Sequence, residues 1–145
     1  MRKTAWLLPL ALSMSLSFTP ALAGRALAAD HHQNAKITPL VTKDLVKGPG
    51  GEITMMTVEY QPGGVDPIHT HNAQAFVYVL EGTIVMQVKG GPEVTLTPGQ
   101  TFYEGPDDVH VVGRNASKTK PAKFVVFFVK DKGAPILTPV ANSSK

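Results

Sequence analysis

The chain has 145 residues, no cysteine and a formal net charge of +3 at pH 7. This length suits one domain with a single core, and the lack of cysteine excludes disulfide cross-links, so stability must come from packing. Residues 1–23 hold two of the 14 basic residues and no acidic one, so without them 12 basic residues face 11 acidic ones. No lysine or arginine cluster remains, and we expect no nucleic-acid partner.

The first 23 residues predict a secretory signal peptide. Arg2 and Lys3 precede the uncharged stretch AWLLPLALSMSLSF, and TPALA then ends in the small residues that a signal peptidase accepts before Gly24. The apolar stretch is shorter than the ~20 residues that cross a bilayer, so a transmembrane anchor is not expected. A second possible cleavage position follows Ala29. We therefore expect a periplasmic or secreted protein with no membrane attachment after cleavage.

Two tails are expected to flank the folded part. Residues 24–36 predict a flexible tail, because their second half is polar and unpatterned. His31 and His32 lie there, and we interpret them as part of the tail rather than as a metal site. Residues 132–145 form a C-terminal tail whose Ile136 either packs on the domain or reaches a second subunit.

Between the tails, residues 37–131 predict one all-β domain. Short apolar or alternating segments are separated by Gly and Pro turns. The expected strands are 53–60, 75–80, 83–89, 93–96, 101–104, 110–113 and 123–130. The joints are too short for crossover helices, which predicts a mostly antiparallel sandwich or barrel. In one strand Phe76 and Tyr78 alternate with Val77 and Val79, and the sequence leaves open which pair faces the interior.

Two histidines stand one residue apart in the segment DPIHTHNAQAFVYVLEG, residues 66–82. Residues two apart in an extended segment point to the same face, about 6.5–7 Å apart at the backbone, so His69 and His71 can converge on one ion. His110 begins a later strand after another turn, in EGPDDVHVVGRN. Two hairpins lie between, which gives the chain room to return beside the first strand. We predict that the three imidazoles surround a common point.

The segments PGGVDPIHTHNAQAFVYVLEGTIVMQV (62–88) and PGQTFYEGPDDVHVVGRN (98–115) resemble the two sequence motifs of the cupin superfamily. The resemblance implies a double-stranded β-helix of the jelly-roll type, with a metal held inside by three His and usually one Glu. In this resemblance, His69 and His71 match the ligands of the first motif, and His110 matches that of the second. The second motif departs in two details: its usual turn glycine is replaced within GPDD, and Asn115 stands one residue late.

The first motif departs from the family in a ligand. The family's glutamate should stand four residues after His71, where this chain has Ala75. Two residues are candidates for the missing donor. Gln74 is adjacent, although in a regular strand its side chain points away from the face of residue 75. Glu104 ends a strand near His110, and if it faces inward it is also the candidate catalytic general base; otherwise it is a solvated turn carboxylate.

The resemblance implies a divalent transition metal, with Fe, Mn, Ni, Cu and Zn all compatible with imidazole ligands. So small a barrel admits one small organic molecule, apolar or aromatic to suit the surrounding Val, Phe and Met. We expect an exported enzyme of dioxygenase, isomerase or lyase type. The alternative is a periplasmic cupin that holds a metabolite or metal without turnover. Family habit also implies a homodimer.

Overall fold

The computed structural model describes residues 33–46 and 50–140. The predicted signal peptide lies outside these residues, and so do His31 and His32 of the predicted tail. The described part contains no helix, and therefore none long and apolar enough to cross a membrane. Its strands are β1 (Gln33–Asp44), β2 (Gly51–Val65), β3 (His69–Thr70), β4 (Ala73–Glu81), β5 (Ile84–Val88), β6 (Val94–Leu96), β7 (Thr101–Glu104), β8 (His110–Asn115), β9 (Ala122–Asp131) and β10 (Thr138–Pro139).

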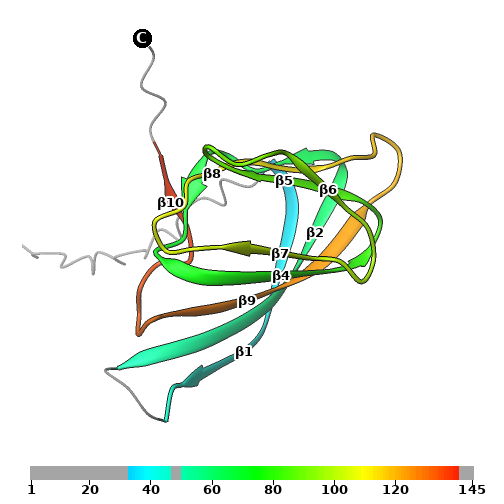
Figure 1. The fold of residues 1–145 in the computed structure, drawn as a ribbon. Coiled ribbons are helices and arrows are strands. Elements are labelled where there is room, and N and C mark those ends of the chain that lie inside the picture. The colour runs from blue at the N-terminus through cyan, green and yellow to red at the C-terminus, as the bar shows by residue number, and fades with distance from the viewer. Residues whose placement is uncertain (1–32, 47–49, 141–145) are drawn as a thin grey trace, which may run out of the picture.

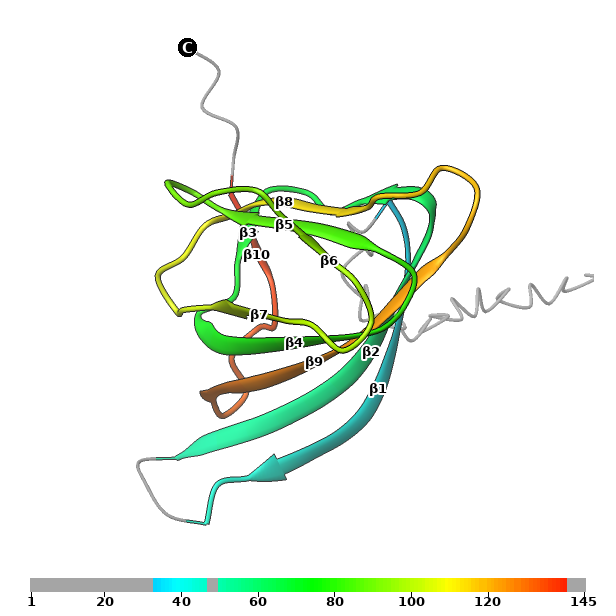
Figure 2. The ribbon, with the colours of Figure 1, turned by 45° about the vertical axis from the view of Figure 1, so that its right-hand side comes forward.

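The strands form one curved sheet that wraps into a jelly-roll barrel (Figures 1 and 2). Their order is β10-β3-β8-β2-β9-β4-β7, with β5 bonded to β8 and β6, and with β1 bonded to β2. Strands β4, β7 and β9 make one wall, and β5, β6 and β8 face them across the interior (Figure 1). All of these pairings are antiparallel. The all-β jelly-roll prediction is confirmed, and each expected strand overlaps an observed one.

The burial of β4 settles which of its faces lines the interior. Val77 and Val79 are buried, whereas Phe76 is 44% and Tyr78 47% exposed. Strand β9 lies between β2 and β4 and alternates in the same way. Its inward side chains are Phe124, Val126 and Phe128. Successive residues of a strand point to opposite faces, so the smaller side chains of β4 and the aromatic ones of β9 share the core.

Strand β1 corrects the predicted N-terminal boundary. It begins at Gln33, so residues 33–36 belong to a strand and not to the tail. It pairs with most of the length of β2, with a register shift between Pro39 and Val41. Proline cannot donate to a β-ladder and is placed at edges and bulges, as here. Because Pro39 breaks the alternation, the sequence pattern of this segment did not indicate a strand.

The C-terminal segment folds back over one end of the barrel. Lys130, at the end of β9, is buried, forms an ion pair with Glu52 and donates to the Ala134 carbonyl at 2.7 Å. Strand β10 then pairs with β3, and Ile136 packs against the core cluster. Of the two alternatives for this tail, the structure has the one that packs on the barrel.

Asn115, at the end of the second motif, fixes the turn that follows β8. Its Nδ2 donates to the carbonyls of Lys120 at 2.8 Å and of Gln61 at 3.1 Å, and its Oδ1 accepts from the Ser117 amide at 2.8 Å. Buried amide groups need such partners, and here they link the end of β8 to β2 and to the turn before β9. Although Asn115 stands one residue late in the motif, its side chain still stabilises the turn after β8.

Candidate metal centre

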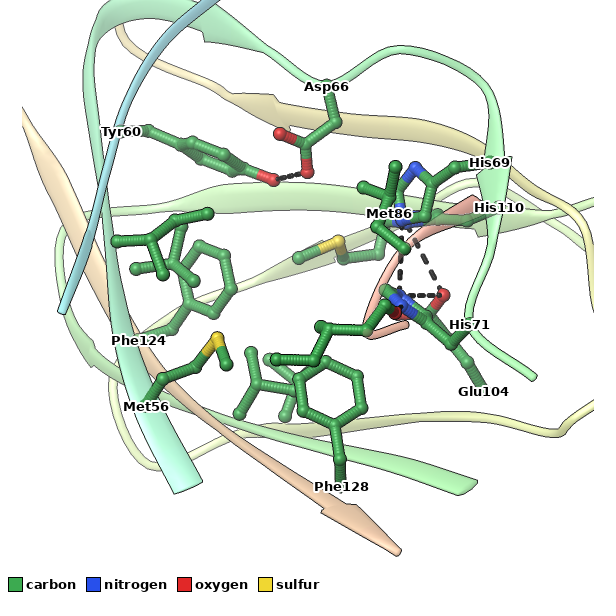
Figure 3. A pocket seen from close by; sticks show the side chains of 16 residues that line it. Met56, Tyr60, Asp66, His69, His71, Met86, Glu104, His110, Phe124 and Phe128 are labelled. Atoms are coloured by element: carbon green, nitrogen blue, oxygen red, sulfur yellow. Dashed lines mark hydrogen bonds and ion pairs between the residues drawn. The ribbon is translucent and has the colours of Figure 1, made fainter. Parts of the chain in front are cut away.

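The three histidines predicted to converge do so inside the barrel (Figure 3). His69 and His110 are direct partners in the pairing of β3 with β8, and His71 follows two residues after His69. His69 Nε2 lies 3.1 Å from His71 Nε2 and 3.4 Å from His110 Nδ1. All three rings are buried. Short antiparallel pairing thus brings together side chains that are 41 residues apart in sequence.

Glu104 completes this group. Its side chain is 3% exposed, and Oε2 lies 3.4 Å from both His71 Nε2 and His110 Nδ1. In the pairing of β4 with β7, Glu104 stands directly opposite Ala75. Opposite residues on one face have Cβ atoms about 4.5–5.5 Å apart, so a carboxylate from β7 can reach the place where one from β4 is absent. The residue expected as a general base therefore lies among the possible ligands.

Gln74 does not join the group. It is exposed on the outer face of β4, because its neighbours Ala73 and Ala75 both point inward. A strand cannot present adjacent residues to the same face without a bulge, and none interrupts the pairing of β4 with β9 at this position. The suggestion that Gln74 supplies the missing donor is corrected in favour of Glu104.

We call His69, His71, His110 and Glu104 the four-residue cluster. One ligand atom from each lies within 4.8 Å of all the others. Donors about 2.1 Å from a tetrahedrally coordinated ion are roughly 3.4 Å apart, close to the separations observed here. Three imidazoles and one carboxylate are donors that divalent transition metals accept. The cluster therefore has the composition and the spacing to hold such an ion.

The outer nitrogens of two rings determine their tautomers. His69 Nδ1 donates to the Pro67 carbonyl and His71 Nδ1 to the Ile136 carbonyl, each at 2.7 Å. Because a carbonyl only accepts, both Nδ1 atoms carry protons, and both neutral rings keep a lone pair on Nε2. These lone pairs face each other at 3.1 Å. That contact is repulsive unless a proton or a cation lies between the two atoms.

Burial disfavours a proton on the His69 imidazole. It lowers the pKa of His69 from 6.5 to about 4, against the opposing effect of the Pro67 carbonyl. Burial by itself raises the pKa of Glu104, but positive charge beside it, on His71 or His110, lowers the pKa overall and keeps the carboxylate ionised. Glu104 Oε2 and His110 Nε2 are buried without a hydrogen-bond partner. A metal ion would satisfy the first of these atoms directly.

The cluster opens onto a cavity of about 50 Å³. Its walls are mostly apolar and include Met56, Met86, Phe124, Phe128 and Ile136. A cavity needs about 10–15 Å³ for each water centre, so this one has room for a few waters or one small molecule. The expectation of a small, largely apolar binding space agrees with these walls.

Two polar residues of this cavity were not singled out from the sequence. Tyr60, fully buried on β2, donates its hydroxyl proton to Asp66 Oδ2, and both line the cavity (Figure 3). Asp66 stands three residues before His69 in the segment that carries the histidine pair. This closeness to His69 was the feature of the sequence that could have indicated Asp66. An aspartate in a loop near a turn is too common to indicate a site.

Comparison with known proteins finds a family model, described as "Cupin domain", that matches residues 56–128, which is half of the chain. Among solved structures, the polyketide cyclase RemF from Streptomyces resistomycificus matches with a TM-score of 0.60 and 21% identity over 79% of this chain and 76% of that chain. No curated protein sequence matches.

Two further solved structures are similar. An oxalate oxidase in complex with the substrate analogue glycolate has a TM-score of 0.58 and 25% identity, covering 74% of this chain and 56% of that one. The DMSP lyase DddQ from Ruegeria pomeroyi has a TM-score of 0.56 and 18% identity, covering 74% and 54%. The present chain thus spans about half the length of these two proteins.

Proposed function

Because the chain belongs to the cupin superfamily, we propose that it binds one divalent transition metal in the four-residue cluster and acts on a small organic molecule. The observation that carries this proposal is the contact of two acceptor nitrogens, His69 Nε2 and His71 Nε2, at 3.1 Å beside a buried carboxylate. A cation between these atoms removes the repulsion and compensates the charge of Glu104.

A metal in this position would supply Lewis-acid activation of a bound oxygen atom. The chain contributes the rest. The carbonyls of Pro67 and Ile136 hold two imidazoles in the ligating tautomer, and the apolar walls keep water away from a bound molecule. The reaction types we propose are oxidation of the dioxygenase kind, isomerisation or a lyase reaction. The similar structures bear the names of a cyclase, an oxidase and a lyase, so fold likeness does not choose among them.

Elemental analysis of the purified protein tests metal binding. We expect one equivalent of Fe, Mn, Ni, Cu or Zn for each chain, and a preparation that cannot be loaded with any of them would refute the proposal. Oxygen uptake with a panel of phenols and diketones then tests turnover. A loaded protein with no turnover on these or on isomerase and lyase substrates would favour the alternative, a binding protein without catalysis.

Export is the second part of the proposal. It is supported by the basic head, the apolar stretch and the small-residue cleavage position of residues 1–23. Mass spectrometry of the protein recovered from the exported fraction should give an N-terminus at Gly24, or at Asp30 if the later position is used. An intact Met1 in that fraction would contradict a cleaved signal.

We also propose a homodimer formed through the outer face of β4 and β7. Phe76, Tyr78 and Tyr103 expose 44%, 47% and 49% of their surface there, and the rings of Phe76 and Tyr103 lie 5.2 Å apart. This aromatic face, as we call these three side chains, carries no charge. A second copy of the chain can cover it by two-fold symmetry, which brings the same apolar surface from each side.

A further inference from the structure

Lys130 carries a buried charge outside the four-residue cluster. Its side chain is 2% exposed and lies at the end of β9, on the inner face that also carries Phe128. The ammonium group donates to the Glu52 carboxylate, to the Ala134 carbonyl at 2.7 Å and to the Asp131 carbonyl at 3.4 Å. A buried charge needs such partners. The two carbonyls belong to the turn after β9, so the lysine holds this turn in place.

The turn leads into a segment that touches the metal site. We call residues 134–140 the C-terminal strap. The Ile136 carbonyl of this strap accepts a hydrogen bond from His71 Nδ1 at 2.7 Å, and the Ile136 side chain packs against the core cluster. Farther along, Pro139 is the partner of His69 in the pairing of β10 with β3. The strap thus contacts both residues of the histidine pair, and the buried lysine holds its first residue.

The path from Lys130 to His71 is short and stiff. Lys130 fixes the Ala134 carbonyl, which belongs to the same planar peptide unit as the Pro135 nitrogen. The proline ring locks its own backbone angle φ at about −65°, and the residue before a proline is restricted to extended conformations. Fixing the Ala134 carbonyl therefore limits where the Ile136 carbonyl can lie.

The position of the Ile136 carbonyl matters because it decides where His71 carries its proton. A carbonyl only accepts, so this hydrogen bond keeps the proton on Nδ1 and leaves the lone pair on Nε2, which faces the cluster. Without that acceptor the proton can move to Nε2, where it would occupy the lone pair that a metal needs. Such supporting contacts orient a ligating imidazole and fix its tautomer.

We propose that Lys130 is a positioning residue for the metal site: through the C-terminal strap it sets the Ile136 carbonyl that orients His71. This inference rests on metal binding in the four-residue cluster, as proposed above. It gives a role to a buried charge that contacts neither the cluster nor the cavity.

The test compares Lys130→Met with the wild type in two measurements. Two-bond proton–nitrogen NMR correlations of metal-free, ¹⁵N-labelled protein at mildly alkaline pH give the tautomer of His71, and isothermal titration gives the affinity for Zn²⁺. We expect the wild-type proton on Nδ1 and a large share of it on Nε2 in the variant. Zn²⁺ should bind at least about fivefold more weakly, somewhat less than the 10- to 100-fold typical of losing a direct partner of a ligand, because Lys130 acts through the strap.

Lys132→Met is the matched control. Lys132 stands in the same turn, but its ion pair with Asp44 is exposed, so the tautomer and the affinity should both stay as in the wild type. A loss of stability alone does not change a tautomer in the folded protein, so this measurement separates positioning from a purely structural role. An unchanged tautomer in Lys130→Met, a smaller loss of Zn²⁺ affinity, or equal effects in the control would overturn the inference.

If Lys130→Met does not fold, Pro135→Gly decides. Pro135 is exposed, so this change spares the core and loosens only the link between Ala134 and Ile136. The same change of tautomer and weaker Zn²⁺ binding should follow, and a wild-type result in either measurement would overturn the inference. A wild type that binds no Zn²⁺ would overturn the metal-binding function, whereas the tautomer, measured without metal, still decides whether Lys130 positions His71.

Discussion

At the scale of single residues, the four-residue cluster holds metal-ligand atoms that repel one another when no ion lies between them. Two imidazoles with fixed tautomers direct lone pairs at each other, and a carboxylate lies 3.4 Å from one of them. The carbonyls of Pro67 and Ile136, which fix these tautomers, belong to backbone that the barrel holds in place. The cluster is therefore organised before any ion binds, which favours tight metal binding.

Removing a single imidazole should empty the site. We expect His71→Ala and His110→Ala to lose stoichiometric metal, because the remaining donors leave the ion open to competing chelators. The measurement is metal content after dialysis against a weak chelator. Gln74→Ala, on the outer face of β4, is the control and should retain its metal. Full metal content in either histidine variant would remove that residue from the ligand set.

The depressed pKa of His69 predicts how the metal-free protein responds to acid. Its pKa is about 4 in the folded state and near 6.5 in the unfolded chain. Between these values the unfolded chain binds the proton and the folded protein does not, so stability falls as pH decreases from about 6.5 to about 4. The expected loss of unfolding free energy is about 3 kcal/mol. Urea titrations of chelator-treated protein across this range measure it.

The control for the acid effect is His69→Gln, which has no imidazole at this position. Its unfolding free energy should fall less over the same pH range. The lowered pKa of Glu104 acts in the same direction, but at lower pH, because its contribution is lost as pH falls through a value below 4.5. Equal acid sensitivity in the wild type and His69→Gln would contradict the assignment to His69.

At the scale of strands, the pairing of β4 with β7 explains how the site keeps a carboxylate. Ala75 and Glu104 stand opposite each other, and both are buried on the inner face. A donor can move from one strand to its partner without changing the position of the ion, because opposite side chains in a ladder are neighbours. The register of β4 and β7 is thus the structural reason that an alanine is tolerated at position 75.

Exchanging the two side chains tests this explanation. We expect Glu104→Ala to weaken metal binding by about 10- to 100-fold, and the double variant Ala75→Glu with Glu104→Ala to recover most of the loss. Isothermal titration with Zn²⁺ measures both. The comparison is Ala75→Gln with Glu104→Ala, which has the same bulk without the charge. If the exchanged double variant bound Zn²⁺ no better than this uncharged comparison, the two positions would not be equivalent.

At the scale of the whole molecule, the barrel has a polar site inside and an uncharged aromatic face outside. The strands that bring Glu104 inward also present Phe76, Tyr78 and Tyr103 outward, because alternate residues of β4 and β7 point to opposite faces. An exposed apolar patch of this kind is typical of a protein–protein contact. The same two strands therefore serve the interior site and the proposed dimer.

Charge placed on the aromatic face should separate the subunits. We expect the wild type to be a dimer and the variant with Phe76→Lys and Tyr103→Lys to be a monomer, because burying lysines against apolar rings is unfavourable. Light scattering coupled to size exclusion measures the mass. Leu40→Lys, on exposed β1, is the control and should remain dimeric. If only the Leu40→Lys control dissociated, the dimer interface would have to lie on β1 instead.

The sequence by itself determined the all-β class, most of the strands and the convergence of three histidines. The class and the strands depend on local pattern, that is, on alternation and on Gly and Pro turns. The convergence combines the two-residue spacing of His69 and His71 with the two hairpins and the second motif that bring in His110. It missed β1, because Pro39 breaks the alternation of that strand and its pairing with β2 tolerates the break through a bulge. The two-residue strands β3 and β10 have no pattern of their own and exist only through their partners.

Only the tertiary structure decided which carboxylates belong to the site. The inward direction of Glu104 depends on its register against Ala75. The position of Asp66 depends on its hydrogen bond with Tyr60 and on the lack of a side chain at Gly113, where a Cβ atom would come within 2.9 Å of Asp66 Oδ2. These are contacts between residues of different strands. A strand pattern states which residues share a face, but the partner opposite each of them is set when the sheet closes, since shifting the register by one residue reverses every side chain.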